Sequence, residues 1–173
     1  MPTQLKPLTE TFMAQVRTAG ITHVTGVPDG WLASLIRQLD DAADITYVPA
    51  AREEEALAIV SGFSMAGKKA MMLTQNVGLL NSLGCFSTLC QNYRIPFVLL
   101  IANRGNLFDK NSYDIPKIRY MDGILSAMNL LTTSYYQFKE EDNLLSKMMD
   151  RAETAQEPAL LMLDYPPHGQ TVQ

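Results

Sequence analysis

The chain has 173 residues, of which 47% are hydrophobic and 18% charged, and its formal net charge is −4. This length suits one domain with a sizeable core, and the composition is not that of a disordered chain. The acidic balance argues against an extended nucleic-acid surface. The longest apolar run, residues 95–102, has 8 residues, whereas a membrane-spanning helix needs about 20. Because no charged-then-apolar leader opens the chain, we expect a cytoplasmic protein.

Short apolar runs alternate with longer amphipathic ones along the chain, as in proteins that alternate strands and helices. The runs that predict strands are residues 21–27, 45–48, 70–74, 96–102 and 159–163. The segments that predict helices are residues 31–39, 52–66, 79–91, 119–128 and 143–153, with a polar loop over 103–117. Strands that are apolar without alternation predict a parallel sheet buried on both faces. The expected fold class is therefore α/β, an open doubly wound parallel sheet with helices on both faces.

Cysteine and histidine are scarce: Cys85, Cys90, His23 and His168 are the only ones in the chain. These residues give little material for a zinc site, a histidine-built metal site or a Ser-His-Asp triad. We therefore expect no metal site built by this chain. The two cysteines are expected to be buried, free and unreactive, which is typical of a reducing compartment.

In a doubly wound sheet, ligands bind beyond the carboxyl ends of the strands, which here selects four segments: residues 26–30, 49–55, 75–80 and 103–119. Residues 26–30 (GVPDG) form a turn in which Asp29 either caps the next helix or faces a ligand. Residues 52–55 (REEE) either begin a solvated helix or set one carboxylate at a buried helix start as an acid/base group. Residues 75–78 (QNVG) end in a glycine, which indicates a special backbone angle or a close approach.

A fourth segment at this edge, residues 103–119, is basic although the chain is acidic. Four cations against two carboxylates give it +2 and leave −6 on the rest of the chain. The charged residues are Arg104, Lys110, Lys117 and Arg119 against Asp109 and Asp114. The segment is either a binding site for an anionic substrate or a solvated loop, because opposite charges at close range attract strongly only where water is excluded.

Residues 53–89 resemble the pyrimidine-binding domain of thiamine-diphosphate enzymes, in which a glutamate stands nine residues before a Gly-aromatic pair, here Glu53 before Gly62 and Phe63. Residues 26–30 (GVPDG) and 74–79 (TQNVGL) resemble the 2-oxoacid decarboxylases for sulfopyruvate and phosphonopyruvate. The spacing in the basic segment is similar to that of sulfopyruvate decarboxylase alpha subunits: Arg104, Gly105, Lys110, Ile115, Pro116 and Arg119. The resemblance covers about residues 10–165.

The resemblance implies a role for individual residues. Glu53 would hydrogen-bond N1′ of the aminopyrimidine and promote the imino form that removes the thiazolium C2 proton. Asp29 would face the reacting carbon and assist proton transfer. The residues that would contact the cofactor are Glu53, Pro28, Gln75, Asn76 and Gly78. Those that would hold the substrate's acid groups are Arg104, Lys110 and Arg119.

Two departures from the family pattern bear on the assembly. Leu80 stands where the family commonly has glycine, and the GDG…N motif that binds Mg²⁺ and diphosphate does not occur in the 173 residues. The resemblance therefore implies that residues 1–173 form a single pyrimidine-binding domain, with the diphosphate- and Mg²⁺-binding domain on a separate beta subunit. The hetero-oligomer would use thiamine diphosphate and Mg²⁺, and this chain would be inactive alone.

The activity that the resemblance implies is decarboxylation of 3-sulfopyruvate to sulfoacetaldehyde and CO₂, a step in coenzyme M biosynthesis. A split phosphonopyruvate decarboxylase is the alternative substrate assignment, and a non-catalytic pyrimidine-domain partner protein is the alternative class. A flavodoxin-like nucleotide-binding module fits the fold class only, because residues 27–29 (VPD) stand where phosphate-binding glycines are needed.

Overall fold

The strands form one parallel sheet in the computed structural model, which describes residues 8–106, 109, 111–135 and 143–164. The strands are β1 (His23–Gly26), β2 (Thr46–Pro49), β3 (Ala70–Gln75), β4 (Val98–Ala102), β5 (Thr132–Ser134) and β6 (Ala159–Leu163). Their order across the sheet is β2-β1-β3-β4-β6-β5, and every neighbouring pair is parallel. The predicted open parallel sheet is thus confirmed.

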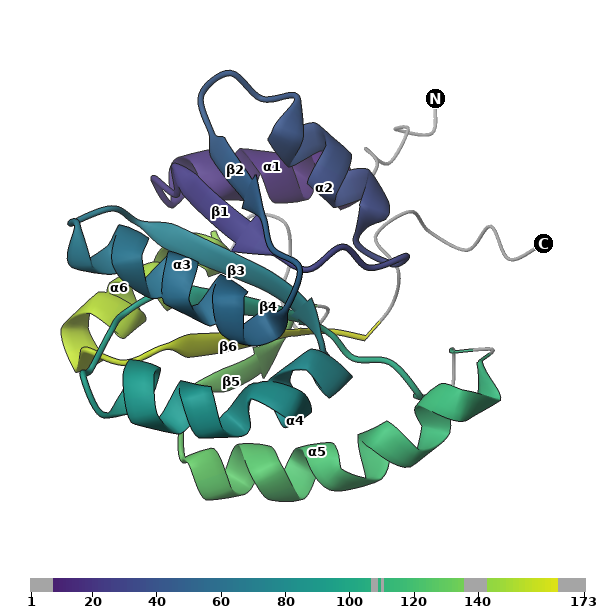
Figure 1. Cartoon of the computed structure of the whole chain (residues 1–173). Helices are drawn as coiled ribbons and strands as arrows, with labels where there is room; N and C mark the ends of the chain where they lie inside the picture. The colour runs from purple at the N-terminus through teal and green to yellow at the C-terminus, as the bar shows by residue number, and fades with distance from the viewer. Residues whose placement is uncertain (1–7, 107–108, 110, 136–142, 165–173) are drawn as a thin grey trace, which may run out of the picture.

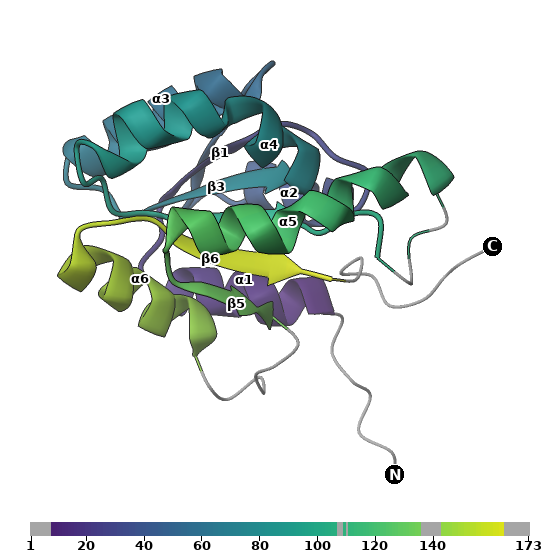
Figure 2. The same ribbon diagram turned by 90° about the horizontal axis from the view of Figure 1, so that it is seen from below.

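Helices cover both faces of the sheet, as predicted (Figures 1 and 2). One face is covered by α1 (Leu8–Thr18), α2 (Ala33–Asp40) and α6 (Leu144–Ala155). The other is covered by α3 (Glu53–Met65), α4 (Asn76–Cys85) and α5 (Ile115–Met128). A π-helical segment, η1 (Phe86–Gln91), continues α4, and a short 3₁₀ segment, η2 (Ser112–Asp114), leads into α5. None of the described helices is long and apolar enough to cross a membrane.

The strands carry the core because their side chains alternate between the two helical layers. In β3, Met71 and Leu73 pack with the α1, α2 and α6 layer, whereas Met72 packs with the other. Every residue of β4 and β6 is buried. This explains why these strands read as unbroken apolar runs, and burial of each large side chain contributes about 1.5–3 kcal/mol.

Two elements lie outside the sequence prediction. Helix α1 was not predicted, yet Phe12, Met13 and Val16 are buried against the neighbouring helices. Strand β5 was also missed, because its three residues are only half-buried and it lies at the sheet edge. Helix α5 begins at Ile115 instead of residue 119, because the first turn of a helix tolerates a proline such as Pro116.

The strand order decides which loops meet. Strands β1 and β4 lie on either side of β3, so the segments that follow these three strands converge at one edge of the sheet. In Figure 2 the arrow of β6 points toward the side on which α5 begins. We call this the ligand edge: residues 27–32, 75–80, 103–106, 109 and 111–119, together with residues 49–55, which follow β2 beside β1.

Candidate functional site

The three glutamates that begin α3 have three different environments. Glu55 Oε2 accepts a hydrogen bond of 2.8 Å from the backbone N–H of Ala51, so this side chain stabilises the helix start. Glu54 is exposed. Glu53 is half-buried, and among the described residues its carboxylate has no hydrogen-bond or ion-pair partner. Glu53 is therefore the one of the three that is both sheltered and open to a ligand.

Gly78 of α4 makes room for the Glu53 side chain. A Cβ at Gly78 would lie 2.2 Å from Thr74 Oγ1 and 2.5 and 2.6 Å from Cγ and Oε1 of Glu53. Gly78 is absent from the residues with positive φ, so its role here is space, not backbone freedom. At this glycine the structure thus shows a close approach by the side chain of Glu53, and the ligand contact expected there stays a prediction.

The residues around Gly78 differ in how much they offer a ligand. Asn76 is wholly buried: its Nδ2 donates to the carbonyl of Arg104 at 2.7 Å, and its Oδ1 accepts from the Val77 N–H at 3.0 Å. Asn76 therefore ties the end of β3 to the segment after β4. Gln75 is half-buried at the end of β3, and Pro28 is exposed in the turn after β1.

Leu80 departs from the family pattern without disturbing the backbone. It lies within α4, packs against the core on the α3–α5 side, and is absent from the residues with positive φ. A helical position accepts leucine readily. The altered residue therefore needs no change in the course of the chain.

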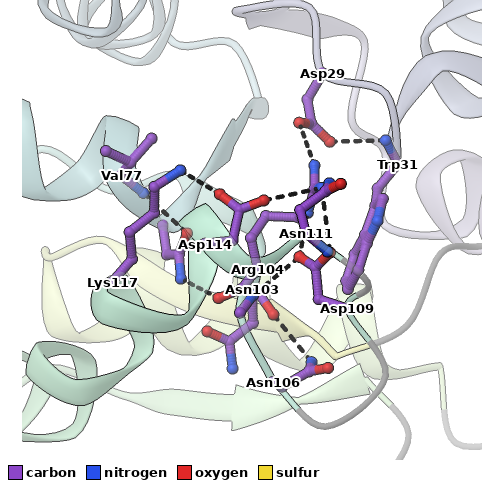
Figure 3. Close-up of polar contacts among 12 residues, drawn as sticks. Asp29, Trp31, Val77, Asn103, Arg104, Asn106, Asp109, Asn111, Asp114 and Lys117 are labelled. Atoms are coloured by element: carbon purple, nitrogen blue, oxygen red, sulfur yellow. Dashed lines mark hydrogen bonds and ion pairs between the residues drawn. The ribbon is translucent and has the colours of Figure 1, made fainter.

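A charged cluster joins the turn after β1 to the segment after β4 (Figure 3). Arg104 Nη1 donates to Asp29 Oδ2 at 3.2 Å, and the guanidinium carbon lies 4.8 Å from the centre of the Trp31 ring. Asp29 Oδ1 accepts from the Trp31 N–H at 2.8 Å. Both carboxylate oxygens of Asp29 are thus occupied, and its side chain is only 5% exposed. Asp29 does not cap α2, whose N-cap is Leu32 without a side-chain hydrogen bond; its bond to the Trp31 N–H instead stabilises the turn that leads into the helix.

Asp109 is the second carboxylate on Arg104. Its Oδ2 accepts from Arg104 Nε at 2.7 Å and from the Gly105 N–H at 2.9 Å, while its Oδ1 accepts from the Asn111 N–H at 3.1 Å. Burial by itself raises the pKa of Asp109, but these hydrogen bonds, that of Arg104 above all, outweigh it and lower the pKa. Asp109 therefore remains ionised and holds the loop closed around Arg104.

Asp114 is the third carboxylate, and it is almost fully buried. Its Oδ2 lies 3.1 Å from Arg104 Nη2, and its Oδ1 pairs with Lys117, whose ammonium lies 5.4 Å from the centre of the Tyr113 ring. Burial lowers the pKa of Arg104, but the Asp109 hydrogen bond and the three negative charges raise it overall. The cluster thus fixes the start of α5 to the end of β4.

The basic segment is therefore mostly paired internally. Arg104 and Lys117 face carboxylates, whereas Arg119 is exposed on α5 and has no ion pair within the part of the chain that the structure describes. Lys110 lies outside the described residues. The net charge counted from the sequence does not reveal this pairing, although two aspartates among four cations are a signal that pairing is possible.

The two cysteines, both within the described residues, are not activated as nucleophiles, because the pKa of each thiol is raised. Cys85 and Cys90 are free, and burial raises the pKa of Cys90 to about 11, so this thiol stays protonated at neutral pH. Cys85 is half-buried, and its pKa is raised as well, first by burial. No group of three or more His, Cys, Asp or Glu side chains in the described ranges could hold a metal ion.

Gly105 provides a test of how tightly this edge is built. A Cβ there would lie 2.1 Å from the carbonyl oxygen of Asp114, and φ is +88°. We expect Gly105→Ala to destabilise the full chain by about 2–5 kcal/mol, because backbone strain and a backbone clash add. Gly67→Ala is the matched control: φ is +75° but the space is open, so about 1–2 kcal/mol is expected. Urea unfolding measures both, and equal losses would contradict the clash.

Comparison with known proteins identifies the class of protein. Residues 7–113 match the family described as "Thiamine pyrophosphate enzyme, N-terminal TPP binding domain". This chain belongs to that family. It is similar to the sulfopyruvate decarboxylase subunit alpha of Methanococcus maripaludis, with 31% identity over 149 residues, 84% of this chain and 87% of the relative.

More distant relatives agree with the fold. The phosphonopyruvate decarboxylase of Streptomyces viridochromogenes is 33% identical over 92 residues, 53% of this chain and 23% of that protein. The crystal structure of benzoylformate decarboxylase from Polynucleobacter necessarius superposes with a TM-score of 0.67 at 21% identity, over 98% of this chain and 32% of that one. The chain thus corresponds to about a third of that structure, and the likeness at this identity concerns the fold alone.

Proposed function

We propose that this chain is the alpha subunit of a thiamine-diphosphate-dependent decarboxylase that converts 3-sulfopyruvate to sulfoacetaldehyde and CO₂. The observation that carries the proposal is the Glu53 carboxylate, which is sheltered against Gly78 and has no partner among the described residues. The family to which the chain belongs and the similarity of the chain to a sulfopyruvate decarboxylase subunit alpha support the same activity. The weaker coverage of phosphonopyruvate decarboxylase does not favour that substrate.

The residues of this chain fit one end of the cofactor. A carboxylate without a protein partner, beside a glycine that leaves space, suits a ring nitrogen with which it can share a proton. Glu53 would hold that proton at N1′ of the aminopyrimidine, while Gln75 and Pro28 line the same edge. When bound, the cofactor supplies the electron sink for loss of CO₂. Gly78 contributes by leaving room for the Glu53 side chain to lie against α4.

The described residues include no group of three or more His, Cys, Asp or Glu side chains that could hold Mg²⁺, and the GDG…N motif is absent from the sequence. We therefore assign Mg²⁺ and the diphosphate to a beta subunit. The relative of similar length is itself named a subunit, which supports a hetero-oligomer. Most of α3 and all of α4 suit a partner chain, because residues 56–65 and 76–85 contain no charged side chain, whereas Glu54 and Glu55 at the start of α3 are exposed. Free cysteines support a reducing compartment such as the cytoplasm.

Arg119 is our candidate for holding an acid group of the substrate, together with Lys110. It is exposed near the start of α5, and no carboxylate in the described ranges neutralises it. We expect Arg119→Ala to raise KM for sulfopyruvate at least tenfold with little change in kcat, because a hydrogen bond to a charged group contributes about 1.5–3 kcal/mol. Arg151→Ala, on the opposite helical layer, should change neither constant; an unchanged KM in Arg119→Ala would exclude this residue from anion binding.

The function is tested by reconstitution. This chain, alone and co-expressed with the beta subunit, is assayed with thiamine diphosphate and Mg²⁺ for CO₂ release from 3-sulfopyruvate and, separately, from phosphonopyruvate. We expect turnover of sulfopyruvate by the pair only. Turnover of phosphonopyruvate alone would reassign the substrate, and no turnover of either by an assembled, cofactor-loaded pair would support a non-catalytic partner protein.

A further inference from the structure

Each nitrogen of the Arg104 guanidinium faces a carboxylate of this chain. Its Nε and Nη2 face Asp109, its Nη1 faces Asp29, and its Nη2 also lies 3.1 Å from Asp114. The Trp31 ring stacks on it at 4.8 Å, and its side chain is only 9% exposed. A substrate oxyanion would have to displace one of these partners to bind it with two parallel hydrogen bonds.

The charge balance also opposes substrate binding at Arg104. Three carboxylates surround Arg104, and Lys117 is the only other cation paired with them in the described part of the chain. The cluster of these five residues therefore carries a net −1 when all are ionised. An anionic 2-oxoacid gains nothing by approaching it, because like charges repel most where water is excluded.

What Arg104 does hold is the turn after β1. Asp29 lies three residues beyond β1 and Arg104 two residues beyond β4, so the ion pair spans the end of β3, where Gln75 and Gly78 lie. The backbone of Arg104 is fixed as well, since its carbonyl accepts from Asn76. The ion pair thus ties the turn that contains Pro28 to the loop that leads into α5 (Figure 3).

We propose that Arg104 is a positioning residue: through Asp29 it fixes the turn at residues 28–30 to the segment after β4, and it does not hold the substrate's acid group. The two residues then act as one unit, and neither touches the substrate directly. This proposal rests on the decarboxylase function proposed above. It leaves anion binding to cations outside the cluster.

A double-mutant cycle in the reconstituted pair tests the proposal. The variants are Asp29→Asn, Arg104→Lys and the double variant, each assayed for kcat and KM with 3-sulfopyruvate. We expect each single variant to lower kcat about tenfold or more with KM changed less than threefold. The double variant should be no more than about threefold worse than the more damaging single variant.

Substrate binding by Arg104 predicts a different pattern. In that case Arg104→Lys raises KM tenfold or more. The affinity of the cofactor-loaded pair for the unreactive 3-sulfopropanoate, measured by calorimetry, falls by a similar factor. The effects of Arg104→Lys and Asp29→Asn then multiply in the double variant. That pattern overturns the proposal. Asp44→Asn, which breaks the exposed pair with Arg17, is the control for loss of a salt bridge and should leave kcat unchanged.

A measurement that needs no turnover tests the positioning role of Arg104 independently of the proposed decarboxylase function. Trp31 is the only tryptophan of the chain and stacks on Arg104, so its fluorescence in this chain alone reports on the cluster. We expect Asp29→Asn and Arg104→Lys to shift its emission in the same direction, and the double variant to add nothing. Additive or opposite shifts in the emission would show that Asp29 and Arg104 do not act as one unit. This conclusion would hold whether or not the wild-type pair decarboxylates sulfopyruvate. If Arg104→Lys does not fold, Asp109→Asn, which loosens Arg104 from its other side, replaces it in both measurements.

Discussion

Glu53→Gln is expected to lower turnover of the reconstituted pair at least 100-fold while the chain remains folded. The amide has the shape of the carboxylate but cannot take up and return a proton, and general acid–base catalysis contributes about 10²–10⁴-fold. Glu53 is half-buried and has no partner among the described residues, so no hydrogen bond is lost in the free chain. The measurement is kcat for 3-sulfopyruvate together with urea unfolding, where a change below about 0.5 kcal/mol is expected.

The adjacent glutamates supply the controls for this variant. Glu54→Gln removes the same charge at the same helix start but at an exposed position, and turnover should stay within threefold. Glu55→Gln removes a charge from the residue that caps the helix, so a small loss of stability is expected with turnover retained. Full activity of Glu53→Gln in a cofactor-loaded pair would contradict the proposed role of Glu53 as the residue that shares a proton with the cofactor.

The sequence was sufficient for the fold because the signal for each central strand is strong. Buried parallel strands such as β4 and β6 read as unbroken apolar runs, and Gly67 marks the end of α3 with a positive φ. Helix α1 has a weaker signal, since Phe12, Met13 and Val16 stand in a segment otherwise rich in polar residues, and they pack into the core together with residues of α6. The short strand β5 is defined by its pairing with β6. This pairing is a tertiary contact, and no local sequence pattern predicts it.

The site was predictable only in part, because its ion pairs join residues that are far apart in the chain. The resemblance picked Glu53 from three consecutive glutamates, and the structure distinguishes the same residue by its burial and its lack of a partner. Arg104 was expected among the cations for the substrate, yet its charge faces Asp29, Asp109 and Asp114. Asp29 is 75 positions away in the chain, so only the order of the strands brings the pair together.

Gly78→Ala is expected to reduce turnover about 100-fold through Glu53 while lowering the stability of the chain by no more than about 2 kcal/mol. The new methyl group would overlap Thr74 Oγ1 and the Glu53 side chain. Thr74 is fully buried and β-branched, so it resists rotation, whereas Glu53 can swing toward solvent. In stability, the gain of about 1 kcal/mol from alanine in a helix offsets an overpacking cost of about 1–3 kcal/mol.

Gly123→Ala is the control that distinguishes displacement of the Glu53 side chain from a general effect of alanine in helices. Gly123 is exposed within α5 and a Cβ there would meet nothing within 4 Å, so the full chain should gain about 0.5–1 kcal/mol with unchanged turnover. Gly78→Ala with normal kcat would mean that Glu53 keeps its place despite the methyl group, and the space at Gly78 would then not matter for catalysis. Loss of kcat in a folded, cofactor-loaded pair is the result expected from displacement of the Glu53 carboxylate, because a damaged core would lower stability strongly as well.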